Sequence, residues 1–233
     1  MDITLNTIDV GEGKPLVLLH GNGESTEYFA QQIPYFQASR RVIAVDTRGH
    51  GLSPRGTAPF TLTQFAEDLR KMLDQKGLEK VDLLGFSDGG NIAMLFALKY
   101  PERVDRLILN GANLRPSGVK LAVQLPIVLG YGIVALMAKF SRKAAVKKEV
   151  LGLMVHEPHI APGDLAGLTC PTLVIVGSND MIRHGHSKKI AAAIPNAAFV
   201  TLHGSHFIAA EASVEFNRVV EKFLAENDNS AQS

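Results

Sequence analysis

Short apolar runs alternate with amphipathic stretches along most of this chain, and this alternation restricts the folds that the chain can adopt. The apolar runs have the length of strands, and they lie at residues 15–19, 41–45, 81–86, 104–109, 172–176 and 198–202. The amphipathic stretches have helical spacing, and they lie at residues 61–75, 88–99, 186–194 and 211–225. This order predicts an α/β fold: a mostly parallel twisted sheet, flanked by helices, that binds ligands at the carboxyl ends of its strands.

Three further local features give separate predictions. Residues 3–8 alternate apolar and polar side chains, which is typical of a half-exposed strand. Thr61 or Thr63 is placed to cap the start of the helix at 61–75. The polar residues 227–233 are expected to form a disordered tail.

Residues 114–168 break the alternation and are expected to be a helical insertion late in the sheet. The chain has 233 residues, of which 46% are hydrophobic, and this is enough for one globular core with a small insertion. The core would then consist of residues 1–113 and 169–226.

The charge and cysteine content bear on the possible partners, disulfides and location of the protein. The chain has 24 Lys and Arg against 23 Asp and Glu, and this net charge of +1 does not suggest a nucleic-acid partner, which would need a basic patch. Cys170 is the only cysteine, which excludes an internal disulfide, and we expect it to be buried and inert. The first residues lack the basic and apolar regions of a secretory signal, so a cytoplasmic location is expected.

Gly85-x-Ser87-x-Gly89 stands between the predicted strand at 81–86 and the predicted helix at 88–99. A serine hydroxyl is a poor nucleophile unless it is held exposed beside a base. A sharp strand-to-helix turn flanked by glycines holds a serine in this way, and the helix start directs free N–H groups at the reacting carbonyl. Ser87 is therefore the candidate nucleophile, although the bare pattern also occurs in ordinary turns.

An acid and a base follow two later strands. Asp180 comes after the strand at 172–176, and His206 comes after the strand at 198–202. In a catalytic triad His206 would take the proton of Ser87, and Asp180 would fix the tautomer of the imidazole. His203 is the alternative base, and Asn179 and Asp164 are weaker alternatives to the acid.

A negative charge that develops on the substrate needs hydrogen-bond donors. The backbone N–H of Asp88, the residue after the nucleophile, is one candidate donor. The other is the backbone N–H of Asn22, in the loop after the first buried strand. The alternative interpretation of that loop is a plain turn.

These motifs together resemble the α/β-hydrolase superfamily, in which nucleophile, acid and histidine follow this chain order. The resemblance runs from about residue 15 to the last helix, and the matching motifs are His20-Gly21-Asn22-Gly23, Asp46-x-Arg48-Gly49-x-Gly51-x-Ser53, Gly85-x-Ser87-x-Gly89-Gly90, Gly177-x-x-Asp180 and Gly204-x-His206. It implies that residues 46–53 give structural support and that residues 114–168 form a helical cap. Since position 87 is Ser and not Asp, the haloalkane-dehalogenase and epoxide-hydrolase branches are disfavoured.

The elbow Gly-Phe-Ser-Asp-Gly-Gly is similar to that of valacyclovir-hydrolase-like esterases, which have Trp in place of Phe86. This resemblance implies that Asp88, with Phe86 beside it, binds the substrate and that Asp88 selects α-amino-acid esters. The alternative is that the Asp88 carboxylate only meets the dipole of the helix that begins there.

The insertion contains a long uncharged run. Residues 121–138 have no charged side chain and reach the lower length limit of a membrane span. Pro126, Gly130 and Gly132 interrupt the run, and a span would separate the two halves of the sheet. We therefore expect a cap over an apolar acyl pocket, and the alternatives are a dimer interface or contact with a membrane surface. The basic residues that suit an anionic surface are Lys139, Arg142, Lys143, Lys147 and Lys148.

No metal or cofactor is expected. His156 and His159 lack the spacing of a helical zinc pair, and Pro158 lies between them. His184 and His186 are expected in a loop, without a ligand role.

The sequence thus predicts a cofactor-free, carboxylesterase-like serine hydrolase, monomeric or dimeric, that cleaves small carboxylic esters or thioesters through a Ser87 acyl-enzyme. Two alternatives stay open at this point. One is a carbon–carbon bond hydrolase that uses the same three residues, and the other is a ligand-binding member with slow turnover.

Overall fold

A computed structural model describes residues 2–229 of the chain. One sheet runs through the molecule, with strand order β1-β3-β2-β4-β5-β6-β7. Its strands are β1 (Thr7–Val10), β2 (Pro15–Leu19), β3 (Arg41–Val45), β4 (Val81–Phe86), β5 (Val104–Asn110), β6 (Thr172–Gly177) and β7 (Ala197–Leu202). Strand β1 is antiparallel to β3 and the other pairs are parallel, which confirms the predicted mostly parallel α/β fold.

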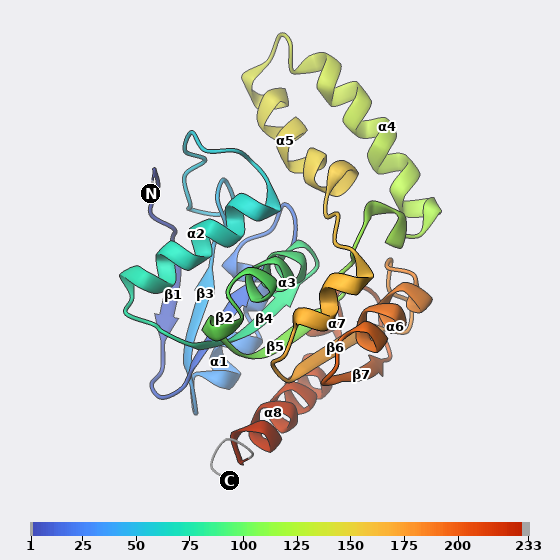
Figure 1. The fold of residues 1–233 in the computed structure, drawn as a ribbon. Helices are drawn as coiled ribbons and strands as arrows, with labels where there is room; N and C mark the ends of the chain where they lie inside the picture. The colour runs from blue at the N-terminus through green and yellow to red at the C-terminus, as the bar shows by residue number, and fades with distance from the viewer. Residues whose placement is uncertain (1, 230–233) are drawn as a thin grey trace.

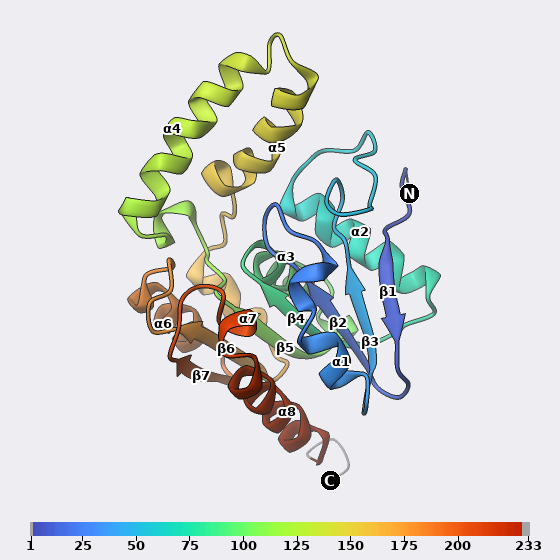
Figure 2. The same cartoon turned by 180° about the vertical axis from the view of Figure 1, so that it is seen from behind.

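Helices cover both faces of the sheet. They are α1 (Gln32–Phe36), α2 (Leu62–Gln75), α3 (Asp88–Lys99), α4 (Leu121–Met137), α5 (Arg142–His156), α6 (His184–Ala193), α7 (Ile208–Glu211) and α8 (Ser213–Asn229). Short 3-10 helices are η1 (Thr26–Phe29), η2 (Pro101–Arg103), η3 (Pro116–Gly118) and η4 (Pro162–Gly167). Figure 1 shows α2 and α3 in front of the sheet, and Figure 2 shows α1 and α8 on its other face.

The central strands supply both hydrophobic cores because successive side chains of a strand point to opposite faces. In β4, Leu83 packs with the side chains of α2 and α3, whereas its neighbour Leu84 packs with those of α1 and α8. Every residue of β4 is buried, as expected for a parallel strand that is covered on both faces.

The first predicted strand is wrong in its bounds. The structure has β1 at Thr7–Val10, and residues 3–6 are extended without strand pairing. Ile3 and Leu5 are buried, which accounts for the alternation. The backbone of Asn6 bonds to Asp46 N–H and to Ser53 Oγ, so a loop takes the hydrogen bonds that a neighbouring strand would have taken.

Two helix boundaries also differ from the prediction. Helix α6 begins at His184, so His184 and His186 lie in its first turn and not in a loop. Helix α8 continues to Asn229, so residues 227–229 of the expected tail are helical. The rest of that tail, 230–233, lies outside the described residues. Thr61 is the cap of α2, since its hydroxyl accepts a hydrogen bond from Gln64 N–H at 3.1 Å.

Helices α4 and α5 form a hairpin that stands above the carboxyl ends of the parallel strands (Figures 1 and 2). Three polar contacts join it and the segment that follows it to the core. Arg55 forms a bidentate ion pair with Glu149, with both N–O distances at 2.7 Å. Asn22 Nδ2 donates to Val150 O, and Leu62 N–H donates to the Glu157 carboxylate. Among residues 2–229, no helix has the length and apolar character needed to cross a membrane.

Candidate active site

Ser87 occupies a strained turn between the end of β4 and the start of α3. Its φ of 53° and ψ of −119° make it the only non-glycine residue with positive φ in the described part of the chain. Such a conformation costs on the order of 1–3 kcal/mol and persists only where the surroundings impose it. The backbone N–H of Ser87 donates to Asn110 O at 2.8 Å, which fixes the turn to the end of β5.

The flanking glycines allow this turn. A Cβ atom at Gly85 would overlap the backbone of Gly89, and a Cβ atom at Gly89 would overlap the backbone of Leu19. The turn therefore packs tightly against both its own helix and the neighbouring strand β2. This is the local structure that the glycine spacing predicts for an exposed nucleophile.

His206 and Asp180 form a buried pair beyond the ends of β7 and β6. His206 Nδ1 and Asp180 Oδ1 lie 2.7 Å apart, and the two residues are 4% and 3% exposed. Asp180 Oδ1 also accepts a hydrogen bond from Ile182 N–H at 2.8 Å. An ionised carboxylate can only accept, so this pair assigns the proton to Nδ1 and leaves His206 Nε2 with a free lone pair.

The other candidates for the acid and the base lie in different surroundings. His203, Asn179 and Asp164 are all exposed, whereas His206 and Asp180 are buried together. Solvent surrounds these three residues, so they lack the enclosed surroundings that hold a catalytic histidine and its acid in place.

Gly111 brings the end of β5 against this pair, and its place after a strand is the only sign of this role in the sequence. Its φ is 62°, and a Cβ atom there would lie 2.7 Å from His206 Cε1 and 3.3 Å from Asp180 Oδ2. Since Ser87 N–H bonds to the preceding residue, Asn110, the end of β5 lies against both the nucleophile turn and the His206–Asp180 pair. Within residues 2–229, His206 Nε2 has no hydrogen-bond partner, so the final hydrogen bond of a triad is not closed in this structure.

Asp88 is buried and held by two amides. Asn22 Nδ2 donates to Asp88 Oδ2 at 2.9 Å, and Asn91 Nδ2 donates to Asp88 Oδ1 at 3.1 Å. Burial raises the pKa of Asp88 to about 6, and the nearby Glu157 contributes to this shift. The Asp88 backbone N–H is the first of α3, and the first N–H groups of a helix have no partner within it.

The loop that contains Asn22 is tied on both sides, unlike a plain turn. His20 Nε2 accepts a hydrogen bond from Thr47 N–H at 3.0 Å, and His20 Nδ1 lies 2.7 Å from Gly21 O. Burial lowers the pKa of His20 to about 4, so this imidazole is neutral at pH 7. The Asn22 side chain contacts both Asp88 and Val150 O of α5.

A small pocket adjoins Ser87, Asp88 and Asn22. Its lining residues are Asn22, Ser87, Asp88, Asn113, Val119, Met154, Glu157, Met181 and Ile182. The free space is only about 20 Å³, which is room for about one water molecule. A substrate can therefore occupy the site only if side chains or the α4–α5 hairpin move.

Phe86 does not line this pocket, in contrast to its predicted place beside the substrate. Its ring stacks on Tyr28 with centroids 4.1 Å apart and lies 4.8 Å from the His206 ring. Phe86 ends β4 with its side chain pointing to the α8 face, so it supports the histidine and not the substrate side of the turn.

Glu157 is a pocket residue that the sequence did not single out. Its carboxylate accepts a hydrogen bond from Leu62 N–H at 2.8 Å, and burial raises its pKa. Together with Asp88 it gives the pocket two carboxylates, whereas none of the pocket's lining residues is Lys or Arg. No signal in the sequence joined Glu157 to Ser87, because they are far apart along the chain and meet only through the hairpin.

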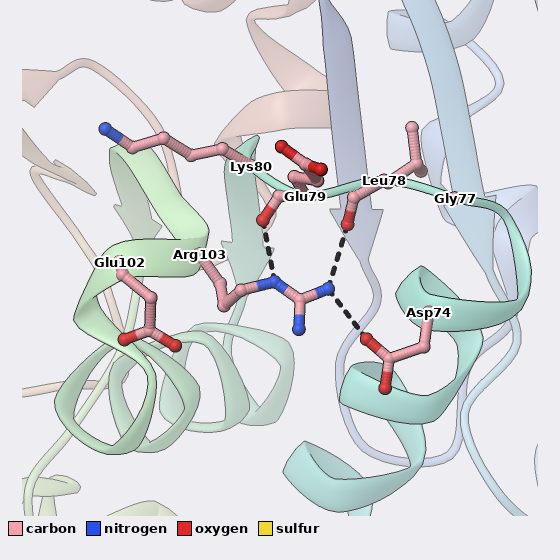
Figure 3. Close-up of a pocket in the computed structure, with 7 residues that line it drawn as sticks. All are labelled: Asp74, Gly77, Leu78, Glu79, Lys80, Glu102 and Arg103. Carbon is pink, nitrogen blue, oxygen red and sulfur yellow. Dashed lines mark hydrogen bonds and ion pairs between the residues drawn. The ribbon is translucent and has the colours of Figure 1, made fainter.

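A wider pocket of about 640 Å³ lies elsewhere, before the amino end of β4 (Figure 3). There Arg103 bonds to the backbone oxygens of Glu79 and Leu78 and pairs with Asp74 at 2.9 Å. These contacts fasten the turn after α2, and parallel sheets bind ligands at the other edge. The Ser87 pocket is therefore the stronger candidate site.

His186 and His156 have structural contacts. His186 Nε2 accepts a hydrogen bond from Leu114 N–H at 3.0 Å, and the ring of His156 lies 5.0 Å from that of Tyr131. In the described part of the chain, no three His, Cys, Asp or Glu side chains are grouped as metal ligands. Cys170 is partly buried just before β6, and burial raises the pKa of its thiol.

Comparison with known proteins agrees with this architecture. A family model described as the alpha/beta hydrolase fold matches residues 14–131. A 2-hydroxymuconate semialdehyde hydrolase from Pseudomonas putida is 30% identical over 260 residues, which cover 96% of this chain and 91% of that protein.

Two solved structures are similar over nearly their whole length. A meta-cleavage product hydrolase from Pseudomonas fluorescens IP01 has a TM-score of 0.79 and 26% identity, and the match covers 96% of this chain and 95% of that one. A thermophilic esterase from Thermogutta terrifontis has a TM-score of 0.77 and 25% identity, covering 97% and 94%.

Proposed function

The chain belongs to the α/β-hydrolase family, and from this premise we propose that it is a serine hydrolase with Ser87 as nucleophile and Asp180 and His206 as its partners. The observation that carries the proposal is the strained Ser87 turn beside a buried His206–Asp180 pair. Strain at a single polar residue is a feature of functional sites, and a buried Asp–His pair orients a general base.

The mechanism proceeds in two halves. Ser87 Oγ attacks the substrate carbonyl carbon while His206 Nε2 takes the hydroxyl proton. The bond to the leaving alcohol or thiol breaks as His206 returns this proton to it. Water then attacks the acyl-enzyme with His206 again as base, which releases the acid and restores Ser87.

Two backbone donors would stabilise the negative charge on the substrate oxygen. The N–H of Asp88 stands at the positive end of α3, and the N–H of Asn22 lies in the loop that faces it. The side-chain bond from Asn22 to Asp88 holds these two donors in a fixed relation.

Small carboxylic esters or thioesters are the proposed substrates, and the α4–α5 hairpin is the proposed cap over them. Val119, Met154, Met181 and Ile182 give the pocket an apolar side for the acyl group. Asp88 and Glu157, with no Lys or Arg among the lining residues, favour a substrate that carries an ammonium group, such as an α-amino-acid ester.

Carbon–carbon bond hydrolysis is the second candidate, because two of the similar proteins are named as hydrolases of 2-hydroxymuconate semialdehyde and of a meta-cleavage product. The same three residues would act, with the broken bond lying between two carbons. A substrate that carries a carboxylate would meet Asp88 and Glu157, and this repulsion is the physical argument that places ester hydrolysis first.

Labelling with a fluorophosphonate, followed by intact mass and peptide mapping, tests the nucleophile. We expect one adduct, on Ser87, that is absent in Ser87→Ala and lost in His206→Ala. Unlabelled wild-type protein would refute the serine mechanism.

A panel of neutral esters, α-amino esters and vinylogous diketones then separates the reactions. Turnover of esters alone supports the proposal, whereas turnover of the diketones alone makes the second candidate correct. A single burst of product without turnover would instead indicate a ligand-binding member of the family.

A further inference from the structure

Helix α4 exposes an apolar face that nothing in the described chain covers. None of its residues is buried, and the face that is turned away from α5 carries large apolar side chains. These are Leu121, Leu125, Val128, Leu129, Ile133, Leu136 and Met137, each between 41% and 66% exposed, and Phe140 follows at the hairpin tip with 89% exposed. A surface helix ordinarily places charged residues there, and a contiguous apolar patch on this scale marks an interaction site.

The hairpin segment carries a positive net charge, whereas the rest of the chain carries a negative one. Residues 120–149 contain six cationic side chains and one anionic side chain, Glu149, which gives this segment a net charge of +5. Since the whole chain carries +1, the remainder carries −4. Within the described chain Glu149 is paired with Arg55, whereas Lys139, Arg142 and Lys148 form no ion pair.

The cations border an open groove between the end of α4 and the start of α5. The groove has a volume of about 430 Å³, and Lys139, Arg142 and Lys148 line it together with Val146, three alanine side chains and one carboxylate, Glu149. Cationic ends above an apolar floor suit a ligand with a phosphate group attached to hydrocarbon. Phe140, the most exposed aromatic ring of the hairpin, stands between the two helices that form the groove.

We propose that the α4–α5 hairpin docks on the surface of a membrane that contains anionic lipids. The apolar face of α4 would lie at the boundary between the lipid head groups and the acyl chains. The cations of the tip would contact lipid phosphates. This is attachment to one leaflet and does not require a span. It goes beyond the proposed hydrolase activity and does not depend on it, because it concerns a surface outside the Ser87 pocket.

A second copy of this chain is the other occupant to consider for the same face. A symmetric dimer through the hairpins would place two segments of charge +5 side by side, and like charges oppose that contact. An anionic lipid surface matches both properties of the hairpin, its apolar face and its excess of positive charge.

Co-sedimentation with lipid vesicles tests the proposal on the full chain. Wild-type protein should bind vesicles of equimolar phosphatidylcholine and phosphatidylglycerol, and bind phosphatidylcholine alone much more weakly. The triple variant L129Q/I133Q/L136Q should bind the mixed vesicles at least about tenfold more weakly, because its apolar contacts are removed. Val214→Gln, which changes an equally exposed apolar residue on α8, should bind like wild type.

A charge variant keeps the test independent of any folding defect in the apolar variant. K139Q/R142Q/K148Q should lose the preference for phosphatidylglycerol, and the binding of wild type should weaken in concentrated salt as the screening length shortens. Circular dichroism and melting curves check that each variant is folded.

Two results would overturn the proposal. One is wild-type protein that stays in the supernatant with the mixed vesicles. The other is a dimer, measured by sedimentation equilibrium without lipid, that L129Q/I133Q/L136Q converts to a monomer while vesicles have no effect, since the face would then be a self-interface.

Discussion

At the scale of single residues, Asp88 lies where burial, two amide donors and a second carboxylate meet. Asn22 and Asn91 donate to it, and burial raises its pKa to about 6. Because the usual pKa of Asp is near 3.8, this group takes up a proton more readily in the folded protein than in the unfolded chain. Its ionisation therefore opposes folding across a defined pH range.

The stability of the protein should reflect this ionisation. For a raised pKa, the favourable contribution is complete below the unfolded value and is lost as the pH rises through the folded value, so it disappears between about 3.8 and about 6. The full effect is on the order of 3 kcal/mol. We expect the free energy of unfolding of wild type relative to Asp88→Asn to fall over this range, as measured with urea at several pH values.

The comparison with Asp88→Asn is needed because His20 changes in the opposite sense. Its lowered pKa of about 4 makes stability fall as the pH drops below about 6.5. Subtracting the two curves removes this shared contribution. A difference that is flat with pH would contradict the buried, titrating Asp88.

Substitution of Asp88 should also change the substrate preference. If Asp88 binds an ammonium group, Asp88→Ala should raise KM for α-amino esters and leave KM for neutral esters of the same acyl length unchanged. In wild type the ratio of kcat/KM for the two esters should increase as the pH rises through about 6, since Asp88 becomes charged there. The ratio cancels any pH effect that acts equally on both esters. An equal loss on both esters would refute the role.

The candidate triad could be predicted from sequence because each member follows a strand, and the carboxyl ends of parallel strands share one edge. The surroundings of Asp88 could not be predicted in this way. Asn22, Asn91 and Glu157 reach it from three separate elements, and no short motif contains them. The face that the Phe86 ring takes could not be predicted either, because neighbouring strand residues point to opposite faces and the turn motif does not say which face position 86 uses.

At the scale of elements, Arg48 joins three segments under the loop that follows β3. Its guanidinium is fully buried and bonds to Asp68 of α2 and to Asp2, with N–O distances of 2.7 to 2.9 Å. Asp46 in the same loop accepts hydrogen bonds from Thr26 and Leu52 N–H. These contacts support the structural role that the resemblance implied for residues 46–53.

Removing this arginine should destabilise the protein strongly. In Arg48→Met the carboxylate of Asp68 stays buried without its cation, which costs roughly 3–5 kcal/mol. The matched control is Arg70→Met, whose ion pairs with Asp74 and Glu67 are partly exposed and contribute about 1 kcal/mol or less. Urea unfolding of both variants measures the two costs, and equal values would show that the buried network is not a structural anchor.

The bounds of β2, β3, β4 and α3 could be predicted to the residue because their apolar runs are continuous or their turns carry glycine. The bounds of β1 could not, since Ile3 and Leu5 are buried by a loop and not by a neighbouring strand. A segment whose alternate side chains are buried shows the same apolar–polar alternation whether a loop or a strand covers it.

At the scale of the whole molecule, Met154 of α5 and Glu157 just after it line a pocket that has room for about one water molecule. The insertion itself was visible in the sequence as a break in the alternation. Its place beside the pocket was expected only from the family resemblance, because it depends on contacts such as Arg55 with Glu149 and Asn22 with Val150, which join distant parts of the chain.

Loosening one of these contacts should open the hairpin without unfolding the core. In Glu149→Gln the ion pair with Arg55 is lost, and we expect faster amide hydrogen exchange in α5 while β4 and β5 exchange as in wild type. Mass spectrometry of peptic peptides measures this. Glu226→Gln, which breaks an exposed pair with Lys222 on α8, serves as control. Faster exchange throughout the sheet would mean that the hairpin does not open independently.

The Asn22 side-chain amide donates one hydrogen bond to Asp88 and one to Val150 O, and these two acceptors belong to different parts of the molecule. Lifting α5 therefore frees one hydrogen of the amide that orients the pocket carboxylate. By thermodynamic reciprocity, whatever shifts the hairpin must change affinity in the pocket, and a pocket ligand must shift the hairpin by the same factor. If lipid holds the hairpin, the enzyme would respond to the presence of a membrane through one asparagine.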